Sequence, residues 1–135
     1  MNRLVFDIVP QAKGRPRFGN GRTFTPQRTR DFEDEIRRMA KEQYKQAPLT
    51  GAVSLVVTFY LPIPMSWSKK KKENRIGQFH ASRPDLDNLL KGVLDALNGV
   101  LYNSDAQVVK LSAAKFYGTQ PRIEVIFTIM DDTGG

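Results

Sequence analysis

The chain has 135 residues, of which 40% are hydrophobic and 26% are charged. This size favours one domain over 1–135, and the composition is too apolar for a wholly disordered chain. The chain has no cysteine and one histidine, which excludes disulfides, cysteine nucleophiles, and zinc sites built from cysteine thiolates or several histidines. Any metal therefore needs oxygen ligands. No apolar run is long enough for a membrane span or a signal-peptide core, so we expect a soluble, cytoplasmic protein.

Positive charge dominates the chain but is unevenly distributed. Lys and Arg number 21 against 14 Asp and Glu, which gives a net charge of +7. Residues 1–30 hold 7 basic and 1 acidic residues and 49–81 hold 5 and 1, whereas 82–135 hold 5 and 7. This distribution predicts a surface that attracts phosphates in one place and a cation in another.

The first part of the chain predicts a strand, a hairpin and a helix. The apolar run 4–9 indicates a strand, and the Asn-Gly pair at 20–21 is typical of a tight hairpin turn. Thr25 and Pro26 fit a helix start, and apolar residues spaced by three and four predict a helix over 26–47.

The middle of the chain predicts a strand, a loop and a second helix. Both faces of 51–61 are largely apolar, which favours a central strand. The segment 62–84, with its prolines and lysines, predicts an exposed basic loop with one helical turn after Ser66. Leucines at helical spacing from Leu86 to Leu97 predict an amphipathic helix.

Two final strands are predicted over 106–117 and 122–130, joined by a hairpin connection at 118–121, and the tail 131–135 is expected to fray. The order is therefore strand, hairpin, helix, strand, helix, strand, strand. This order predicts an α+β fold in which a mixed β-sheet is covered by two helices.

Acidic residues gather around the second predicted helix. Asp87, Lys91 and Asp95 project within roughly 80° of one another, opposite the leucines. Asp85 shares that side only if it is an N-cap or loop residue. In the plainer interpretation, Asp85 merely caps the helix and Asp87 forms a surface pair with Lys91. The repeated acid and a further one, Asp105, in the following loop weigh against this interpretation.

Three carboxylates without a histidine cluster favour Mg²⁺ or Mn²⁺, which prefer oxygen ligands. On a basic protein the matching chemistry is phosphodiester hydrolysis. The metal would orient a water and polarise the phosphate, and Lys91 would stabilise the transition state.

The motif Arg83-Pro84-Asp85-Leu86-Asp87-Asn88-Leu89-Leu90-Lys91, followed by Leu94-Asp95-Ala96-Leu97 and Ser104-Asp105-Ala106-Gln107-Val108, resembles the signature of the RusA family of Holliday-junction resolvases, small endonucleases common in prophages. The similarity extends over about 5–130 and includes the basic loop at 13–17.

The resemblance implies a RusA-like fold and a homodimer that binds four-way junction DNA and makes paired, symmetric nicks with Mg²⁺ or Mn²⁺. The family's catalytic, metal-binding aspartates map onto Asp85, Asp87 and Asp105, and its catalytic lysine maps onto Lys91. Ser104 departs from the acid that some relatives carry before the last aspartate.

Basic residues outside this motif are candidates for DNA contact, although a run of charge is often only a solvated surface. The candidates are Lys13, Arg15, Arg17, Lys69, Lys70, Lys71, Lys72 and Arg83.

Three further residues have open roles. His80 is a weak candidate for a phosphate contact or a proton carrier. Trp67 either stacks on an exposed base or anchors the long loop to the core. Asp95 is expected to orient Lys91 or to make a structural hydrogen bond.

Two other functions remain open from the sequence. One is a nuclease that acts on flaps, forks or RNA, and the other is a phage nucleic-acid-binding protein without catalysis. The surplus of acids disfavours the second, since carboxylates repel the phosphates that a pure binding protein attracts.

Overall fold

A computed structural model describes residues 2–14, 17–19, 22–24 and 27–130. The strands are β1 (Arg3–Phe6), β2 (Arg17–Gly19), β3 (Arg22–Phe24), β4 (Val53–Leu61), β5 (Val108–Tyr117) and β6 (Arg122–Ile129), and the helices are α1 (Gln27–Gln43), α2 (Lys69–Arg75), α3 (Leu86–Ala96) and the short 3₁₀ turn η1 (Asp105–Gln107). Thr25, Pro26 and the tail 131–135, for which we predicted a helix start and fraying, lie outside the described residues.

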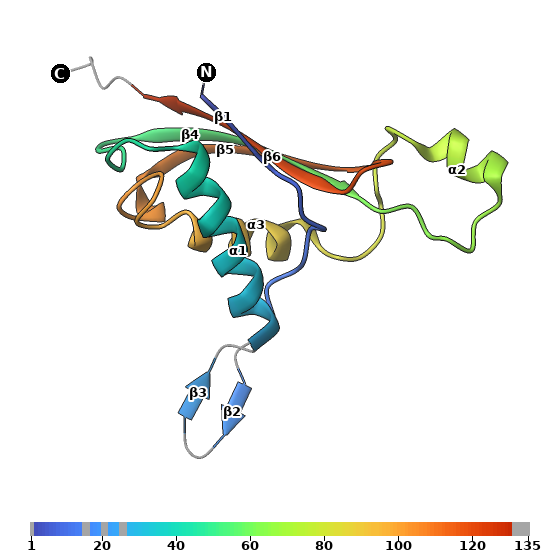
Figure 1. Ribbon diagram of the computed structural model, residues 1–135, viewed down its shortest axis with the longest axis horizontal. Coiled ribbons are helices and arrows are strands. Elements are labelled where there is room, and N and C mark those ends of the chain that lie inside the picture. Colours follow the sequence, from blue (N-terminus) through green and yellow to red (C-terminus); the bar gives the residue numbers. More distant parts are fainter. Residues whose placement is uncertain (1, 15–16, 20–21, 25–26, 131–135) are drawn as a thin grey trace.

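The main sheet has the order β1-β6-β4-β5, with β4 parallel to β5 and antiparallel to β6. The mixed sheet and the α+β class are therefore confirmed, as is the central place of β4. The hairpin β2–β3 forms a separate arm that projects from the body beyond α1 (Figure 1).

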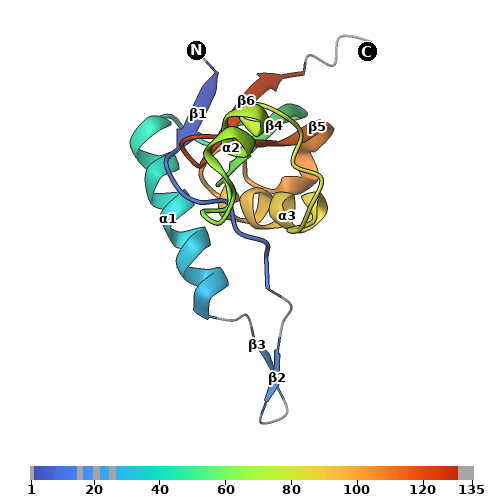
Figure 2. The same cartoon turned by 90° about the vertical axis from the view of Figure 1, so that its right-hand side faces the viewer.

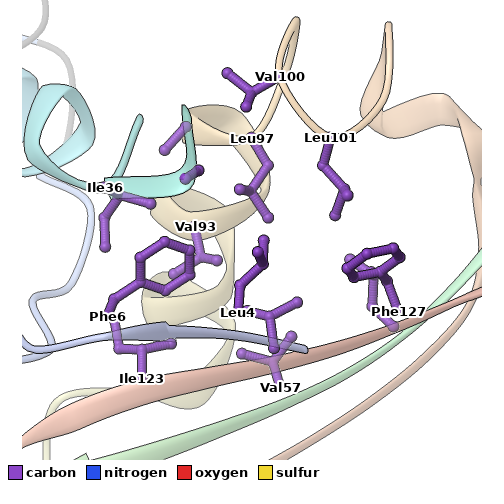
Figure 3. Packing of buried hydrophobic residues seen from close by; sticks show 14 of the residues in the cluster. Leu4, Phe6, Ile36, Val57, Val93, Leu97, Val100, Leu101, Ile123 and Phe127 are labelled. Carbon is purple, nitrogen blue, oxygen red and sulfur yellow. The ribbon is translucent and has the colours of Figure 1, made fainter. Parts of the chain in front are cut away.

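The helices α1 and α3 lie on the same face of the sheet (Figures 1 and 2). The inward residues of β4, which alternate from Val53 to Leu61, are buried there. Figure 3 shows Phe6 of β1 beside Val93 of α3, and Val57 of β4 belongs to the same buried cluster. The opposite face is open in the described chain, and its paired residues Val56 and Ile126 are exposed.

The predicted hairpin between the last two strands is wrong. β5 and β6 do not pair with each other, because β4 lies between them and is bonded to both. The chain crosses the end of β4 at Gly118, whose amide donates to the carbonyl of Leu61 at 3.0 Å. A Cβ on Gly118 would lie 2.9 Å from Cβ of Tyr60, so this crossing needs glycine.

Two other predicted boundaries change. The basic loop 62–84 contains α2, a seven-residue helix rather than one turn, with the side chain of Ser68 capping the amide of Lys71. The helix predicted over 26–47 ends at Gln43, where the side-chain amide bonds to the backbone of Val5 in β1. No helix in the described ranges is long and apolar enough to cross a membrane.

Candidate active site

The start of α3 presents two carboxylates to solvent. Asp85 is the N-cap residue, with extended backbone angles of −69° and 142°, and Asp87 lies in the first turn. The extended conformation is the one that allows Asp85 to share a side with Asp87. Both residues are exposed, at the helix end where the dipole favours negative charge.

The plainer interpretation of these residues is not supported by their contacts. The side chain of Asp85 makes no capping hydrogen bond. Among the ion pairs of the described residues, none joins Asp87 to Lys91, which is exposed one turn later on α3. The two carboxylates and the ammonium are therefore free to meet a ligand.

The loop before Asp85 is held by Lys115 of β5, a residue that sequence reasoning missed. Its ammonium donates to the carbonyl of Ser82 at 2.6 Å and to that of Pro84 at 2.8 Å. These bonds join residues more than thirty positions apart, so no local pattern indicates them. Lys115 thereby ties the residue next to Asp85 to the sheet.

Asp105 lies at the other end of β5. It opens η1, directly before β5 begins, whereas Lys115 and the loop that it holds lie near the end of this strand. Lys115 is seven positions after Val108, which corresponds to about 23 Å along an extended strand. In Figure 1 the loop before α3 and the turn after it lie toward opposite ends of the sheet.

The surroundings of Tyr102 also indicate that Asp105 lies near the end of α3 and not near its start. Its hydroxyl donates to the carbonyl of Leu94, in the last turns of α3. Burial, followed by the negative charges of Asp105 and Asp95, raises the pKa of this tyrosine well above its usual value. Within the described ranges, no three His, Asp or Glu side chains form a group that could hold a metal ion. One chain thus keeps Asp105 apart from Asp85 and Asp87.

Asp95 makes a structural contact rather than orienting Lys91. Its carboxylate binds the ammonium of Lys13, which also lies 3.2 Å from the carboxylate of Glu33. Burial acts to lower the pKa of Lys13, but the hydrogen bonds to Asp95 and Glu33 outweigh it and raise this pKa. Lys13, which we expected to contact DNA, is instead occupied as an anchor between the basic loop, α1 and α3.

His80 is packed inside rather than presented to a phosphate. It is 8% exposed, its ring lies 4.5 Å from that of Tyr117, and its Nδ1 is buried without a hydrogen-bond partner among the described residues. Burial, assisted by the positive charge of Lys115, lowers the pKa of His80 and favours the neutral ring. The structure therefore gives no support to His80 as a phosphate contact.

The basic residues of α2 are available to solvent, as is Arg83. The ring of Trp67 lies 5.2 Å from the ring of Tyr117. The ammonium of Lys71 lies over the Trp67 ring, 4.3 Å from its centre. Trp67 thus anchors the α2 segment to β5. Arg15 lies outside the described residues, and Arg17 belongs to β2 in the projecting arm.

Comparison with known proteins shows the family of this chain. The family model "Endodeoxyribonuclease RusA" matches residues 7–128. The "Uncharacterized protein YqaN" of Bacillus subtilis (strain 168) is 41% identical over 136 residues, which cover 93% of this chain and 96% of that protein. The "Crossover junction endodeoxyribonuclease rusA" of Lactococcus phage r1t is 39% identical over 85 residues, which cover 62% of this chain and 56% of the phage protein. The chain belongs to the RusA family of endodeoxyribonucleases.

Proposed function

We propose that the protein is a Mg²⁺- or Mn²⁺-dependent DNA endonuclease that resolves four-way junctions as a homodimer, by paired symmetric nicks, in DNA recombination and repair. The observation that carries this proposal is the free pair Asp85 and Asp87 with the free Lys91 one turn later. The name of the phage relative supports a crossover junction as the substrate.

The donor chemistry at the start of α3 fits a hard divalent cation. Asp85 and Asp87 offer exposed carboxylate oxygens that no ion pair occupies in the described chain. Mg²⁺ in phosphoryl-transfer sites takes one or two carboxylates together with substrate phosphate oxygens. Asp85 and Asp87 would hold the ion, which supplies charge to the scissile phosphate and lowers the pKa of the attacking water.

The remaining roles fall to other side chains. The ammonium of Lys91, one turn after Asp87, would stabilise negative charge that develops on the phosphate. Lys115 fixes the loop that carries Asp85. The basic residues 69–72 and Arg83, together with Arg15 and with Arg17 of the arm, would bind the DNA backbone around the site.

A nicking assay on a synthetic four-way junction tests the proposal. We expect two symmetric nicks per junction in Mg²⁺ or Mn²⁺ and none in EDTA. Flap, fork and linear duplex substrates with the same arm sequences are the controls. If a flap or fork is cleaved faster than the four-way junction, that structure is the preferred substrate instead. If the protein binds DNA but cleaves it in neither metal, it is not an endonuclease.

The lysines of α2 are expected to act through phosphates. Changing Lys69, Lys70, Lys71 and Lys72 together to glutamine should weaken binding to every DNA form and flatten the slope of log affinity against log salt by about 0.9 for each phosphate that is no longer neutralised. Glutamine keeps the helix propensity, and the exposed lysines at and after the end of α1, Lys41 and Lys45, changed to glutamine are the control. An unchanged salt slope would show that this run is only a solvated surface.

Lys115 is expected to act as a positioning residue. Changing Lys115 to methionine keeps the chain length but leaves the carbonyls of Ser82 and Pro84 without their donor. We expect a higher Mg²⁺ concentration for half-maximal cleavage, with junction binding unchanged. Lys115→Arg should restore much of the metal response, because it keeps a cationic donor. Equal metal responses in Lys115→Met and the unchanged protein would refute this role.

A further inference from the structure

A row of aromatic side chains crosses one end of the main sheet. The register places Phe79 opposite Phe116 of β5, and Phe116 opposite Tyr60 of β4. The ring centres of Phe79 and Phe116 lie 5.0 Å apart with the rings inclined by 23°, and those of Phe116 and Tyr60 lie 6.0 Å apart with an inclination of 28°. Both pairs are stacked. Because Tyr60 alternates with the buried residues of β4, the row lies on the open face of the sheet, away from α1 and α3 (Figures 1 and 2).

The two ends of this aromatic row differ. At the inner end, the guanidinium carbon of Arg122 lies 3.8 Å from the ring centre of Tyr60, and Nε of Arg122 donates to the carboxylate of Glu124 at 2.7 Å. At the outer end, one face of the Phe79 ring stacks on Phe116 while the residue is 73% exposed. No other ring or cation stacks on Phe79 in the described chain. The row therefore ends in an open aromatic face.

The backbone holds Phe79 in this position from both sides. The amide of Tyr117 donates to the carbonyl of Gln78 at 2.9 Å, and the amide of His80 donates to the carbonyl of Lys115 at 3.1 Å. His80 itself is buried directly after the exposed ring. A ring that is already fixed by its neighbours loses little conformational entropy when a ligand stacks on it. Phe79 is therefore a preorganised surface rather than a loose apolar side chain.

The chain around Phe79 is strongly basic. The segment 66–84 contains six Lys and Arg residues and one acid, and among them Lys71, Arg75 and Arg83 are exposed. Proteins that bind single-stranded nucleic acid combine these two features, because positive charge attracts the phosphates and an aromatic ring stacks on a base. The surroundings of the open ring thus fit DNA in which a base is accessible.

We propose that Phe79 is a stacking platform for one unpaired DNA base beside a branch point. Trp67, the other aromatic residue of this segment, is already engaged by Tyr117 and Lys71. Every base has an aromatic face, so the contact selects the structure of the DNA rather than its sequence. The inference rests on the proposed function and deepens it, since it names a residue that recognises the branch.

The platform and the candidate active site share one loop. Phe79 lies six residues before Asp85, which limits the distance between their Cα atoms to about 20 Å. Lys115 joins the two ends of this loop, because its carbonyl accepts from the amide of His80 while its ammonium holds the carbonyl of Pro84. At 3.4 Å for each nucleotide step, a base on Phe79 lies within about six nucleotides of a phosphate at Asp85.

This position predicts selectivity for branched DNA. Inside a continuous duplex each base is stacked between two neighbours, and taking it out of the stack is costly unless it is already unpaired. At a branch point the helices separate, and a base there loses a neighbour. The Phe79 ring replaces that neighbour, so it should strengthen binding to junctions and not to linear duplex.

A binding cycle tests the platform in EDTA, without cleavage. Phe79→Ala should weaken binding to a synthetic four-way junction by about fivefold or more, the usual range for one base stacked on an aromatic ring, and leave linear duplex unaffected. Abasic nucleotides placed in turn at the positions beside the branch supply the other half of the cycle. At the contacted position the unchanged protein should lose the same factor, whereas Phe79→Ala should lose nothing further.

Three variants separate stacking from other causes. Phe79→Tyr keeps an aromatic face and should bind junctions normally, whereas Phe79→Leu keeps an apolar side chain and should bind like Phe79→Ala. Ile76→Ala is the matched control, because Ile76 is 44% exposed in the same segment and takes no part in the aromatic row. The chain has one tryptophan, so unchanged Trp67 emission in each variant shows that the segment stays packed on Tyr117.

Other outcomes would overturn the platform. Equal junction binding by Phe79→Ala and the unchanged protein would do so, as would full affinity in Phe79→Leu or an equal loss on duplex and junction. A change in the number of copies per particle for Phe79→Ala, measured by light scattering, would show that the ring lies between protein copies instead. Absence of coupling at every abasic position would exclude a stacked base.

The cycle also separates this inference from the proposed function. A protein that shows the coupling but cuts no DNA in Mg²⁺ or Mn²⁺ contradicts the proposed endonuclease and leaves the platform in place. A protein that cuts junctions but shows no coupling keeps the endonuclease and loses the platform.

Discussion

Replacing Asp87 by asparagine is expected to abolish cleavage of a four-way junction while leaving junction binding intact or stronger. Asparagine keeps the shape of the side chain but removes the negative charge that would hold the metal and that repels the DNA phosphates. Asp87 is exposed and has no ion partner within the described chain. The folding cost is therefore limited to its helix-dipole contribution, about 1 kcal/mol at most.

The measurement combines a junction-nicking assay in Mg²⁺ with a binding titration in EDTA. Asp85→Asn and Asp105→Asn should behave in the same way. Asp34→Asn is the matched control, because Asp34 is an exposed helical acid whose ion pair in the described chain is with its neighbour Arg37. Nicking by Asp87→Asn at nearly the unchanged rate would remove this residue from the site.

The elements that the sequence predicts well are those whose pattern is local. The leucine spacing locates α3 to within a residue, and the apolar alternation of 51–61 identifies β4 as a central strand. The helix α2 was underestimated because its lysines suggest a solvated run, although lysine is a good helix former and Ser68 is a good N-cap.

The errors come from contacts between distant parts of the chain. The short connection 118–121 is compatible with a hairpin, and only the insertion of β4 between β5 and β6 excludes one. The contact of Lys115 with Pro84 and that of Lys13 with Asp95 also join residues far apart in sequence. The motif indicates which acids matter, but the course of β5 decides that Asp105 lies away from Asp85.

The arrangement of the sheet connects these findings to function. β5 runs parallel to β4. It begins directly after η1 and ends near Lys115, which holds the loop before α3. A strand running in that direction places two parts of the motif at its two ends. Within one chain, Asp105 therefore lies at the opposite end of β5 from the loop that carries Asp85.

Changing Lys91 to alanine is expected to stop cleavage with little effect on folding. Lys91 is exposed on α3 and has no ion partner among the described residues, and alanine is a better helix former, so the melting temperature should stay within a few degrees. Loss of one preorganised charge that stabilises a transition state typically costs about 100-fold or more in rate. Junction binding should weaken by one phosphate contact at most.

Lys41→Ala provides the comparison, since it removes an exposed helical lysine from the last turn of α1. It should cut junctions normally, and Lys91→Arg should retain part of the activity because it retains the charge. Single-turnover cleavage at saturating protein separates the chemical step from binding. If Lys91→Ala cuts within about threefold of the unchanged protein, which is far below the loss expected for such a charge, Lys91 belongs to the solvated surface of α3. A large fall in melting temperature would instead show that this side chain has a structural partner.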